Sequence, residues 1–92
     1  MSEKDRTILR ILLTRGPAYG IEVMEAALLR GVPVGTHAYT ILRRLERSGL
    51  VESYEVAVAL KERGGRLRRY YRITVAGRAL VTTSSYGQPG AR

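Results

Sequence analysis

The sequence predicts a small, mainly helical α+β domain in the order three helices, a two-stranded hairpin and a short fourth helix. Three observations predict this class. Apolar residues recur at helical spacing over the first half of the chain. A later glycine pair is flanked by aliphatic and tyrosine-rich segments typical of strands. The length of 92 residues leaves room for one modest core. We therefore expect one domain over residues 1–82 and a flexible polar tail over 83–92.

The first helix begins near the N-terminus and ends before a proline. Ser2 is suited to cap it, with Asp5 three residues later in a variant of the capping box. Acidic Glu3 and Asp5 also suit the positive end of the helix dipole. Pro17 cannot continue the hydrogen-bond ladder, so the helix stops at "RGP". A broad apolar face is expected from Ile8, Leu9, Ile11, Leu12 and Leu13.

The second helix is predicted from about Ala18 to Leu29. Gly31 follows it as the residue that closes the helix in a left-handed conformation. One face of this helix carries Ile21, Met24 and Leu28. The segment "GVPVG" then forms a turn.

The third helix is predicted from a Thr36 cap to Ser48, with Gly49 after it. Its core side is the apolar stripe Ala38, Ile41, Leu42 and Leu45. The opposite side carries hydrogen-bond donors: Thr36, Thr40, Arg43 and Arg47, with Tyr39 on one flank and His37 and Arg44 on the other. Such side chains can reach phosphates and base edges when a helix lies in the major groove of DNA.

A basic hairpin is predicted next. Val51–Leu60 is the first strand, "KERGGRL" the connection and "RRYYRIT" the return. Alternation places Leu67, Arg69, Tyr71 and Ile73 on one side and Arg66, Arg68, Tyr70 and Arg72 on the other. Residues that can contact a phosphate backbone are Lys61, Arg63, Arg66, Arg68 and Arg69, together with Tyr70. Thr74 then caps the short helix "VAGRALV".

The charge is concentrated in this hairpin. The chain has a formal net charge of +8, and residues 61–72 hold six basic side chains and one acidic one. A local basic patch on a nearly neutral body is the electrostatic footprint of a polyanion binder. A solvated basic loop or attraction to acidic lipid would give the same composition.

Composition also excludes several classes of function. Without cysteine there are no disulfides, no thiolate catalysis and few routes to a zinc site. One histidine, and carboxylates that are accounted for by helix ends and surface pairs, leave no catalytic or metal-binding constellation, so we expect neither an enzyme nor a bound cofactor. No apolar run reaches the roughly 18 residues of a membrane span, and the charged N-terminus is unlike a signal peptide. A cytoplasmic protein is expected.

Three helices followed by a basic hairpin is the order of a winged helix-turn-helix domain. Three segments, "LLTRGPAYGIEVMEAA", "THAYTILRRLERSGLVES" and "GGRLRRYYRITVAGRAL", resemble in order and separation the conserved blocks of the PadR family of transcriptional regulators. The resemblance covers residues 8–80. It places the family's conserved tyrosine at Tyr39, its L-R-R-L motif at residues 42–45 and its basic wing pair at Arg68 and Arg69.

The resemblance implies a dimeric repressor that binds double-stranded DNA at an inverted repeat, with the third helix in the major groove and the wing near the backbone or the minor groove. It also implies long C-terminal helices for dimerisation and, often, a cavity for a small-molecule effector. This chain departs from the family where Ala38 replaces a leucine and Thr40 a proline, and it continues only briefly past the wing. The operator sequence therefore cannot be inferred from the operators of relatives. A dimer would depend on the first helix and the short last one, with Ile8, Ile11, Leu12 and Leu80 as candidates; we expect most of the first three in the core. The alternatives are a monomer, or a partner protein that supplies the missing part.

Two other classes fit the same residues. One is an RNA-binding or non-specific nucleic-acid binder that uses the same patch. The other is a winged helix that contacts an acidic protein partner, for example a phage or plasmid adaptor. Single residues also have alternative roles. Tyr39 could pack against the start of the second helix without touching nucleic acid, and Arg44 could form an exposed ion pair near Glu46 or with Glu52.

Overall fold

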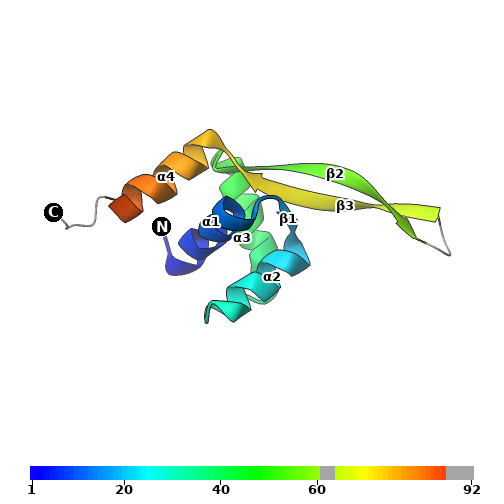
Figure 1. The fold of residues 1–92 in the computed structure, drawn as a ribbon, viewed down its shortest axis with the longest axis horizontal. Helices are drawn as coiled ribbons and strands as arrows, with labels where there is room; N and C mark the ends of the chain where they lie inside the picture. The colour runs from blue at the N-terminus through cyan, green and yellow to red at the C-terminus, as the bar shows by residue number, and fades with distance from the viewer. Residues whose placement is uncertain (61–63, 87–92) are drawn as a thin grey trace.

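The computed structural model describes the backbone of residues 1–60 and 64–86, and the side chains of residues 1–57 and 67–82. Four helices and a three-stranded antiparallel sheet confirm the predicted class (Figure 1). The sheet has the order β1-β3-β2. In chain order the elements are α1 (Glu3–Arg15), β1 (Ala18–Tyr19), α2 (Gly20–Leu29), α3 (His37–Arg47), β2 (Val51–Leu60), β3 (Gly64–Ile73) and α4 (Val75–Tyr86).

Most of the predicted helix ends are confirmed. The Ser2 hydroxyl accepts a hydrogen bond from the Asp5 amide at 3.2 Å, which caps α1. Gly49 follows α3 with a φ of 78°, the left-handed conformation that a glycine adopts without strain. Thr36 holds the N-cap position of α3, but its side chain makes no capping hydrogen bond and its backbone is already helical. The Thr36 hydroxyl is therefore not used at the helix end, unlike in the prediction.

The predicted start of α2 is wrong by two residues, because Ala18 and Tyr19 form β1. They pair with Tyr71 and Tyr70 of β3, and α2 begins only at Gly20. The buried face of α2 also differs from the expected one. It is formed by Gly20, Val23 and Ala27, while Ile21 and Leu28 are exposed and Met24 is partly buried.

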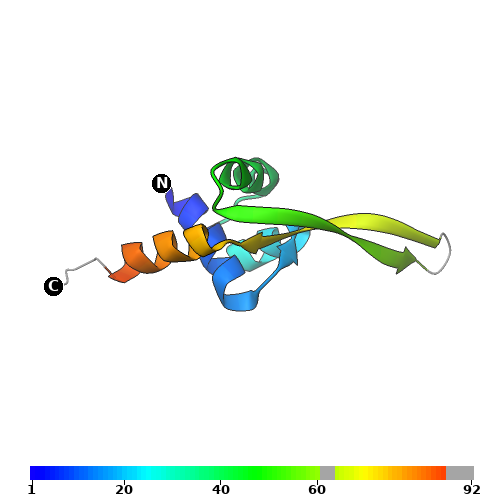
Figure 2. The same cartoon turned by 90° about the horizontal axis from the view of Figure 1, so that it is seen from above.

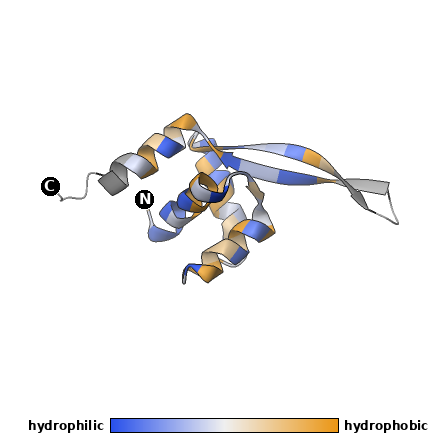
Figure 3. Cartoon of the chain, in the orientation of Figure 1, coloured by the Kyte–Doolittle hydropathy of each residue, from blue (hydrophilic) through white to orange (hydrophobic). Residues whose placement is uncertain are grey.

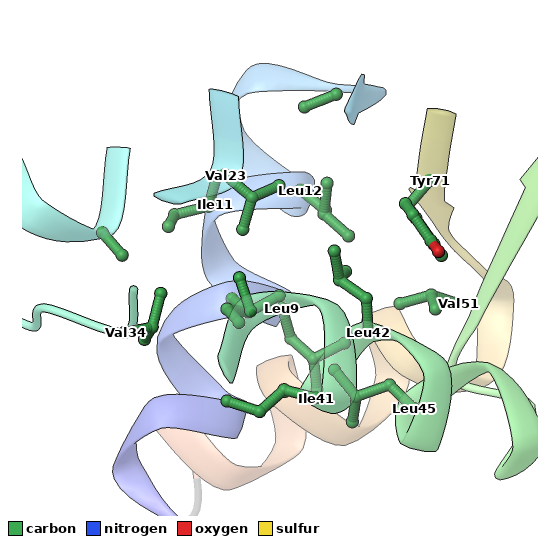
Figure 4. Packing of buried hydrophobic residues seen from close by; sticks show 14 of the residues in the cluster. Leu9, Ile11, Leu12, Val23, Val34, Ile41, Leu42, Leu45, Val51 and Tyr71 are labelled. Atoms are coloured by element: carbon green, nitrogen blue, oxygen red, sulfur yellow. The ribbon is translucent and has the colours of Figure 1, made fainter. Parts of the chain in front are cut away.

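The core lies between α1, α2, α3 and the base of the sheet (Figure 4). Leu9 and Leu42 are fully buried at its centre, and Tyr71 closes it on the side of the sheet. The predicted stripe of α3 is confirmed, since Ala38, Ile41, Leu42 and Leu45 are all buried. Ile8, Ile11 and Leu12 are at most 1 % exposed, so these residues are core and leave little surface for an interface.

The hairpin of β2 and β3 projects from the helical body, and α4 lies on the opposite side of the body (Figures 1 and 2). Hydrophilic residues recur along this hairpin (Figure 3). The register places Ser53 opposite Tyr71 and Glu55 opposite Arg69. β3 begins at Gly64, so Gly64–Leu67 belong to a strand and not to the connection, and residues 61–63 lie outside the described part.

The start of α4 docks on the turn between α3 and β2. The Thr74 hydroxyl accepts from the Gly77 amide at 3.0 Å, as predicted for a cap, and donates to the Gly49 carbonyl at 2.7 Å. α4 packs against α1 and β3 and buries Val81. The helix continues to Tyr86, beyond "VAGRALV" and four residues into the segment 83–92 that the sequence predicts as a flexible tail.

Candidate nucleic-acid interface

The polar side of α3 is open to solvent, opposite its buried stripe. Amphipathic spacing fixes this arrangement, because the apolar residues at i, i+3, i+4 and i+7 turn the remaining side chains outward. The exposed residues on this helix and its cap include five of the predicted contact residues: Thr36, His37, Thr40, Arg43 and Arg47. These donors form a continuous polar surface along α3.

Arg44 is engaged by the body of the domain. Its guanidinium forms an ion pair with the Asp5 carboxylate of α1. The Asp5 side chain is 11 % exposed and the Arg44 side chain 49 %. The alternative of an ion pair for Arg44 is therefore realised, but with Asp5 and not with the residues near Glu46 or Glu52. Sequence spacing could not reveal a pair that joins two helices 39 residues apart.

A hollow of about 630 Å³ lies between α3, the start of α2 and the base of the wing. Its walls combine arginines and aromatic rings: Tyr19, Gly20, Ile21, Tyr39, Arg43, Glu46, Leu67, Arg68, Arg69 and Tyr71. Tyr39 lies against α2, since a Cβ atom at Gly20 would come within 2.2 Å of the Tyr39 ring. Tyr39 is still 37 % exposed, so it packs against α2 and also borders the open surface.

Two arginines of this hollow carry charge that no described carboxylate neutralises. Arg43 projects from α3, and neither it nor Arg68 is within 4 Å of an acidic group among the side chains that the structure describes. Arg68 lies over the Tyr19 ring, 4.2 Å from its centroid, in a cation–π contact. The contact does not remove the charge of the guanidinium. The hollow therefore suits an anion.

Tyr70 is packed into a cluster on the other face of the sheet. Its ring meets Tyr19 edge to face at 5.4 Å and stacks on Tyr54 at 6.0 Å between centroids. Arg72 lies over the Tyr54 ring at 5.2 Å and pairs with Glu52 at 2.6 Å. The predicted contact residue Tyr70 is thus half-buried between two other tyrosines, and its role at DNA stays a prediction.

Arg69 is tied to the body of the protein by a chain of polar groups. Its guanidinium pairs with Glu55 at 2.9 Å and donates to the Ser53 hydroxyl at 2.9 Å. Ser53 in turn donates to the Glu46 carboxylate of α3 at 2.7 Å. Sequence analysis missed Glu46 and Ser53, because only the packing of the hairpin against α3 brings them together.

Tyr71 lies opposite Ser53 in the pairing of β2 with β3, and the residue is 5 % exposed. Burial raises the pKa of the Tyr71 phenol above its usual value of 10.0. Of the nearby charges, the Arg69 and Arg43 guanidinium groups lower the pKa and the Glu46 carboxylate raises it, but burial is the largest effect. The phenol therefore stays protonated and neutral at physiological pH.

A second, smaller hollow of about 240 Å³ lies where α1 meets α3. Lys4, His37, Thr40 and Arg44 contribute to its lining, together with Asp5. Lys4 was missed by sequence analysis, because its place beside α3 follows from how the helices pack. Of the predicted wing contacts, Lys61 and Arg63 lie outside the described residues, and Arg66 is described only by its backbone in β3.

An exposed polar helix on a three-helix core, beside a basic two-stranded wing, defines a winged helix-turn-helix DNA-binding domain. The sequence profile of the PadR-like family of transcriptional regulators matches residues 8–83. The chain belongs to this family, whose members are regulators of transcription, and the resemblance seen in the sequence is confirmed.

Solved structures agree with the assignment. A transcriptional regulator from Clostridium thermocellum is 28 % identical, with a TM-score of 0.70 over 89 % of this chain and 78 % of that one. A PadR family transcription regulator from Clostridium difficile is 24 % identical, with a TM-score of 0.71 over 92 % and 85 % of the two chains. The protein Pex from Synechococcus has the same fold at 23 % identity, with a TM-score of 0.62 over 95 % and 84 %. No curated protein matches the sequence.

Two further observations concern the described residues alone. None of their helices has the length and apolar character that crossing a membrane requires. Within residues 1–60 and 64–86, no three His, Asp or Glu side chains gather in a way that could hold a metal ion.

Proposed function

We propose that this regulator is a repressor that binds an inverted-repeat operator as a dimer, with α3 in the major groove and the wing along the backbone. One observation carries the proposal: the solvent-facing side of α3 is a row of hydrogen-bond donors, flanked by the arginine-lined hollow at the wing. A major groove admits a helix, and its base edges offer acceptors to such donors.

The contacts divide by position on α3. Thr36, Thr40 and Arg47 lie on the outer side of the helix and reach base edges, with His37 at its first turn. Arg43 borders the hollow together with Arg68 of the wing, where a phosphate of the backbone would lie. Phosphate contacts fix the register and base contacts supply sequence preference.

The dimer would form through α4. The apolar residues of α1 are buried in the core of each protomer. Ala76 and Leu80, in contrast, lie one helical turn apart on α4 and are exposed. A single small module on DNA has a limited contact area, and two half-sites about one helical turn apart, roughly 10 base pairs, would double it.

Selection of bound duplexes from a random pool, followed by footprinting and sedimentation equilibrium with the selected duplex, tests the proposal. The expected result is an inverted repeat occupied by two protomers. Equal affinity for selected and random duplex would overturn sequence-specific regulation and support a non-specific nucleic-acid binder. No duplex binding at moderate salt would support the alternative of a winged helix that contacts an acidic protein partner. A single protomer on every site would overturn the dimer.

A further inference from the structure

We propose that Ser53 is a positioning residue that fixes the wing on α3 and so sets the spacing of Arg43 and Arg68 across the hollow. The importance of that spacing rests on the function proposed above. The attachment itself depends only on the contacts of Ser53. No phosphate has to reach Ser53 for the residue to act.

The wing needs a specific attachment because it is a long two-stranded ribbon. β2 and β3 have ten residues each. The three residues of β2 after Tyr54 have exposed side chains: Glu55, Val56 and Ala57. An isolated two-stranded hairpin is marginal in water. From Ser53 to Val56, which pairs with Arg68, the strand extends about 10 Å, so a swing of about 10° at its base moves Arg68 by about 2 Å. Such a displacement would separate a wing contact from its phosphate.

Ser53 lies at the base of this ribbon and uses its hydroxyl in two directions. It donates to Glu46 of α3 at 2.7 Å and accepts from Arg69 of β3 at 2.9 Å. Arg69 also holds Glu55 of β2 at 2.9 Å, so one hydroxyl joins the recognition helix to both strands. Both hydrogen bonds of Ser53 have a charged partner and are therefore short, strong and directional.

This reassigns Arg69. The sequence suggested a phosphate contact, but the guanidinium is occupied by Glu55 and Ser53 on the side of the wing that faces α3. Arg68, the residue before Arg69 in β3, has no such carboxylate among the described side chains and borders the same hollow. We assign positioning to Arg69 and anion binding to Arg68.

The chain also offers a matched control for the ion-pair part of this network. Glu52 and Arg72 form a second cross-strand pair at 2.6 Å, with side chains 52 % and 55 % exposed, close to the 45 % and 50 % of Glu55 and Arg69. Among the described side chains this control pair forms no hydrogen bond to α3, so Glu52→Gln removes an equivalent cross-strand attraction while leaving the link through Ser53 in place.

The first measurement is the distance between body and wing in the free protein. The chain has no cysteine, so spin labels can be placed at Glu25→Cys on α2 and Ala57→Cys on β2, both exposed. Pulsed electron paramagnetic resonance should give a narrow distribution of the distance between the two labels for the labelled parent and for Glu52→Gln. Ser53→Ala and Arg69→Met should broaden it, and Ser53→Thr, which keeps the hydroxyl, should restore it. An unchanged distribution in Ser53→Ala, or equal broadening in Glu52→Gln, would overturn the proposal.

The second measurement is binding to a random-sequence duplex over a range of KCl concentrations, well below the melting temperature of each unlabelled variant. Ser53→Ala should weaken binding about fivefold, the scale of one hydrogen bond, and should lower the salt slope by less than Arg68→Ala does, because a displaced wing loses only part of its phosphate contact. Arg68→Ala should reduce the slope by about 0.9, as expected when one phosphate contact is lost.

The two measurements separate the two ideas. If the parent protein binds no duplex, the proposed function fails, while the distance distributions still decide whether Ser53 positions the wing. A broadened distribution with unchanged duplex affinity would overturn the role of Ser53 in binding. A salt slope in Ser53→Ala that falls as far as in Arg68→Ala, with an unbroadened distance distribution, would show that the hydroxyl site itself contacts a phosphate and would also overturn the assignment.

Discussion

Arg44 of α3 holds the carboxylate of Asp5 in α1, which is the one buried charged side chain in the part of the chain that the structure describes. The two partners differ in their access to water. Arg44 is half exposed and can be hydrated without Asp5, whereas Asp5 without Arg44 would be a buried charge with little solvent. The ion pair therefore joins α3 to α1, and the loss of Arg44 is expected to cost more stability than the loss of the Asp5 charge.

Removing Arg44 should destabilise the domain more than removing the charge of Asp5. We expect a loss of about 2 kcal/mol in the free energy of unfolding for Arg44→Gln and about 1 kcal/mol for Asp5→Asn. Urea denaturation measures both. Arg47→Gln, a change at an exposed α3 arginine, serves as control and should stay within about 0.5 kcal/mol of the parent. Equal losses, or a larger loss for Asp5→Asn, would contradict the asymmetry.

Gly77 is required where α4 docks on the body. A Cβ atom there would lie 2.1 Å from the Leu50 carbonyl oxygen and 2.8 Å from Ile73 Cγ1. A backbone carbonyl cannot move away as the end of a flexible side chain can. Gly77→Ala should therefore lower the free energy of unfolding by about 2–3 kcal/mol, despite the better helix propensity of alanine. Ala79→Ser, at an exposed position of α4, is the control and should cost less than about 1 kcal/mol by propensity alone. Thermal unfolding followed by circular dichroism compares them, and a neutral Gly77→Ala would show that α4 is not docked in this way.

Tyr71 should make stability fall at alkaline pH. Its pKa is raised by burial in the folded state, so above the unfolded value of about 10 the unfolded chain loses this proton first. The folded state then binds more protons, and the free energy of unfolding decreases as pH rises toward the folded pKa. We expect a shallower alkaline decrease in Tyr71→Phe than in the parent.

Urea denaturation at several values between pH 8 and pH 11 would show the difference for Tyr71. Tyr54→Phe, which removes a half-buried tyrosine from the other face of the sheet, is the matched control. Identical pH profiles for the parent and Tyr71→Phe would mean that Tyr71 does not contribute to this dependence.

Local chemistry made much of this fold predictable. The cap at Ser2, the left-handed glycine after α3 and the apolar stripe from Ala38 to Leu45 each follow from neighbours within one or two turns. Tertiary contacts decided the rest. β1 exists because residues 18 and 19 pair with β3 more than fifty residues later. That pairing delays α2, and packing then buries Val23 and Ala27 in place of Ile21 and Leu28.

The candidate site divides in the same way. The exposed donors of α3 were predictable, since amphipathic spacing alone turns them outward. The partners of Arg44 and Arg69 were not, because Asp5, Ser53 and Glu46 meet these arginines only after helices and hairpin have packed. Charge count therefore identified the basic surface but could not show that Arg44 and Arg69 have acidic partners within the domain.

Base reading and backbone binding should separate in mutants of α3 and the wing. Thr40→Ala removes a hydroxyl from the outer face of α3 without changing charge, so affinity for a selected operator should fall about fivefold to tenfold while affinity for random duplex stays constant. Arg68→Ala should weaken both duplexes alike. Fluorescence anisotropy with the two duplexes at one salt concentration measures the ratio. A Thr40→Ala protein that loses the same factor on both would argue against base reading by this residue.

Leu80 provides the test of self-association through α4. It is 39 % exposed, and Ala76 precedes it by one turn on the same side of the helix, whereas Val81 is buried against the body. A charge at position 80 would have to be desolvated in an apolar interface, so Leu80→Glu should shift a dimer to monomer, raising the dissociation constant at least about tenfold. Sedimentation equilibrium follows the shift. Leu29→Glu, at an apolar residue of α2 that is 88 % exposed, introduces the same charge away from α4 and should leave the association unchanged. If Leu29→Glu dissociates the dimer and Leu80→Glu does not, the interface lies on α2, and the two α3 helices would be spaced by a different geometry on DNA.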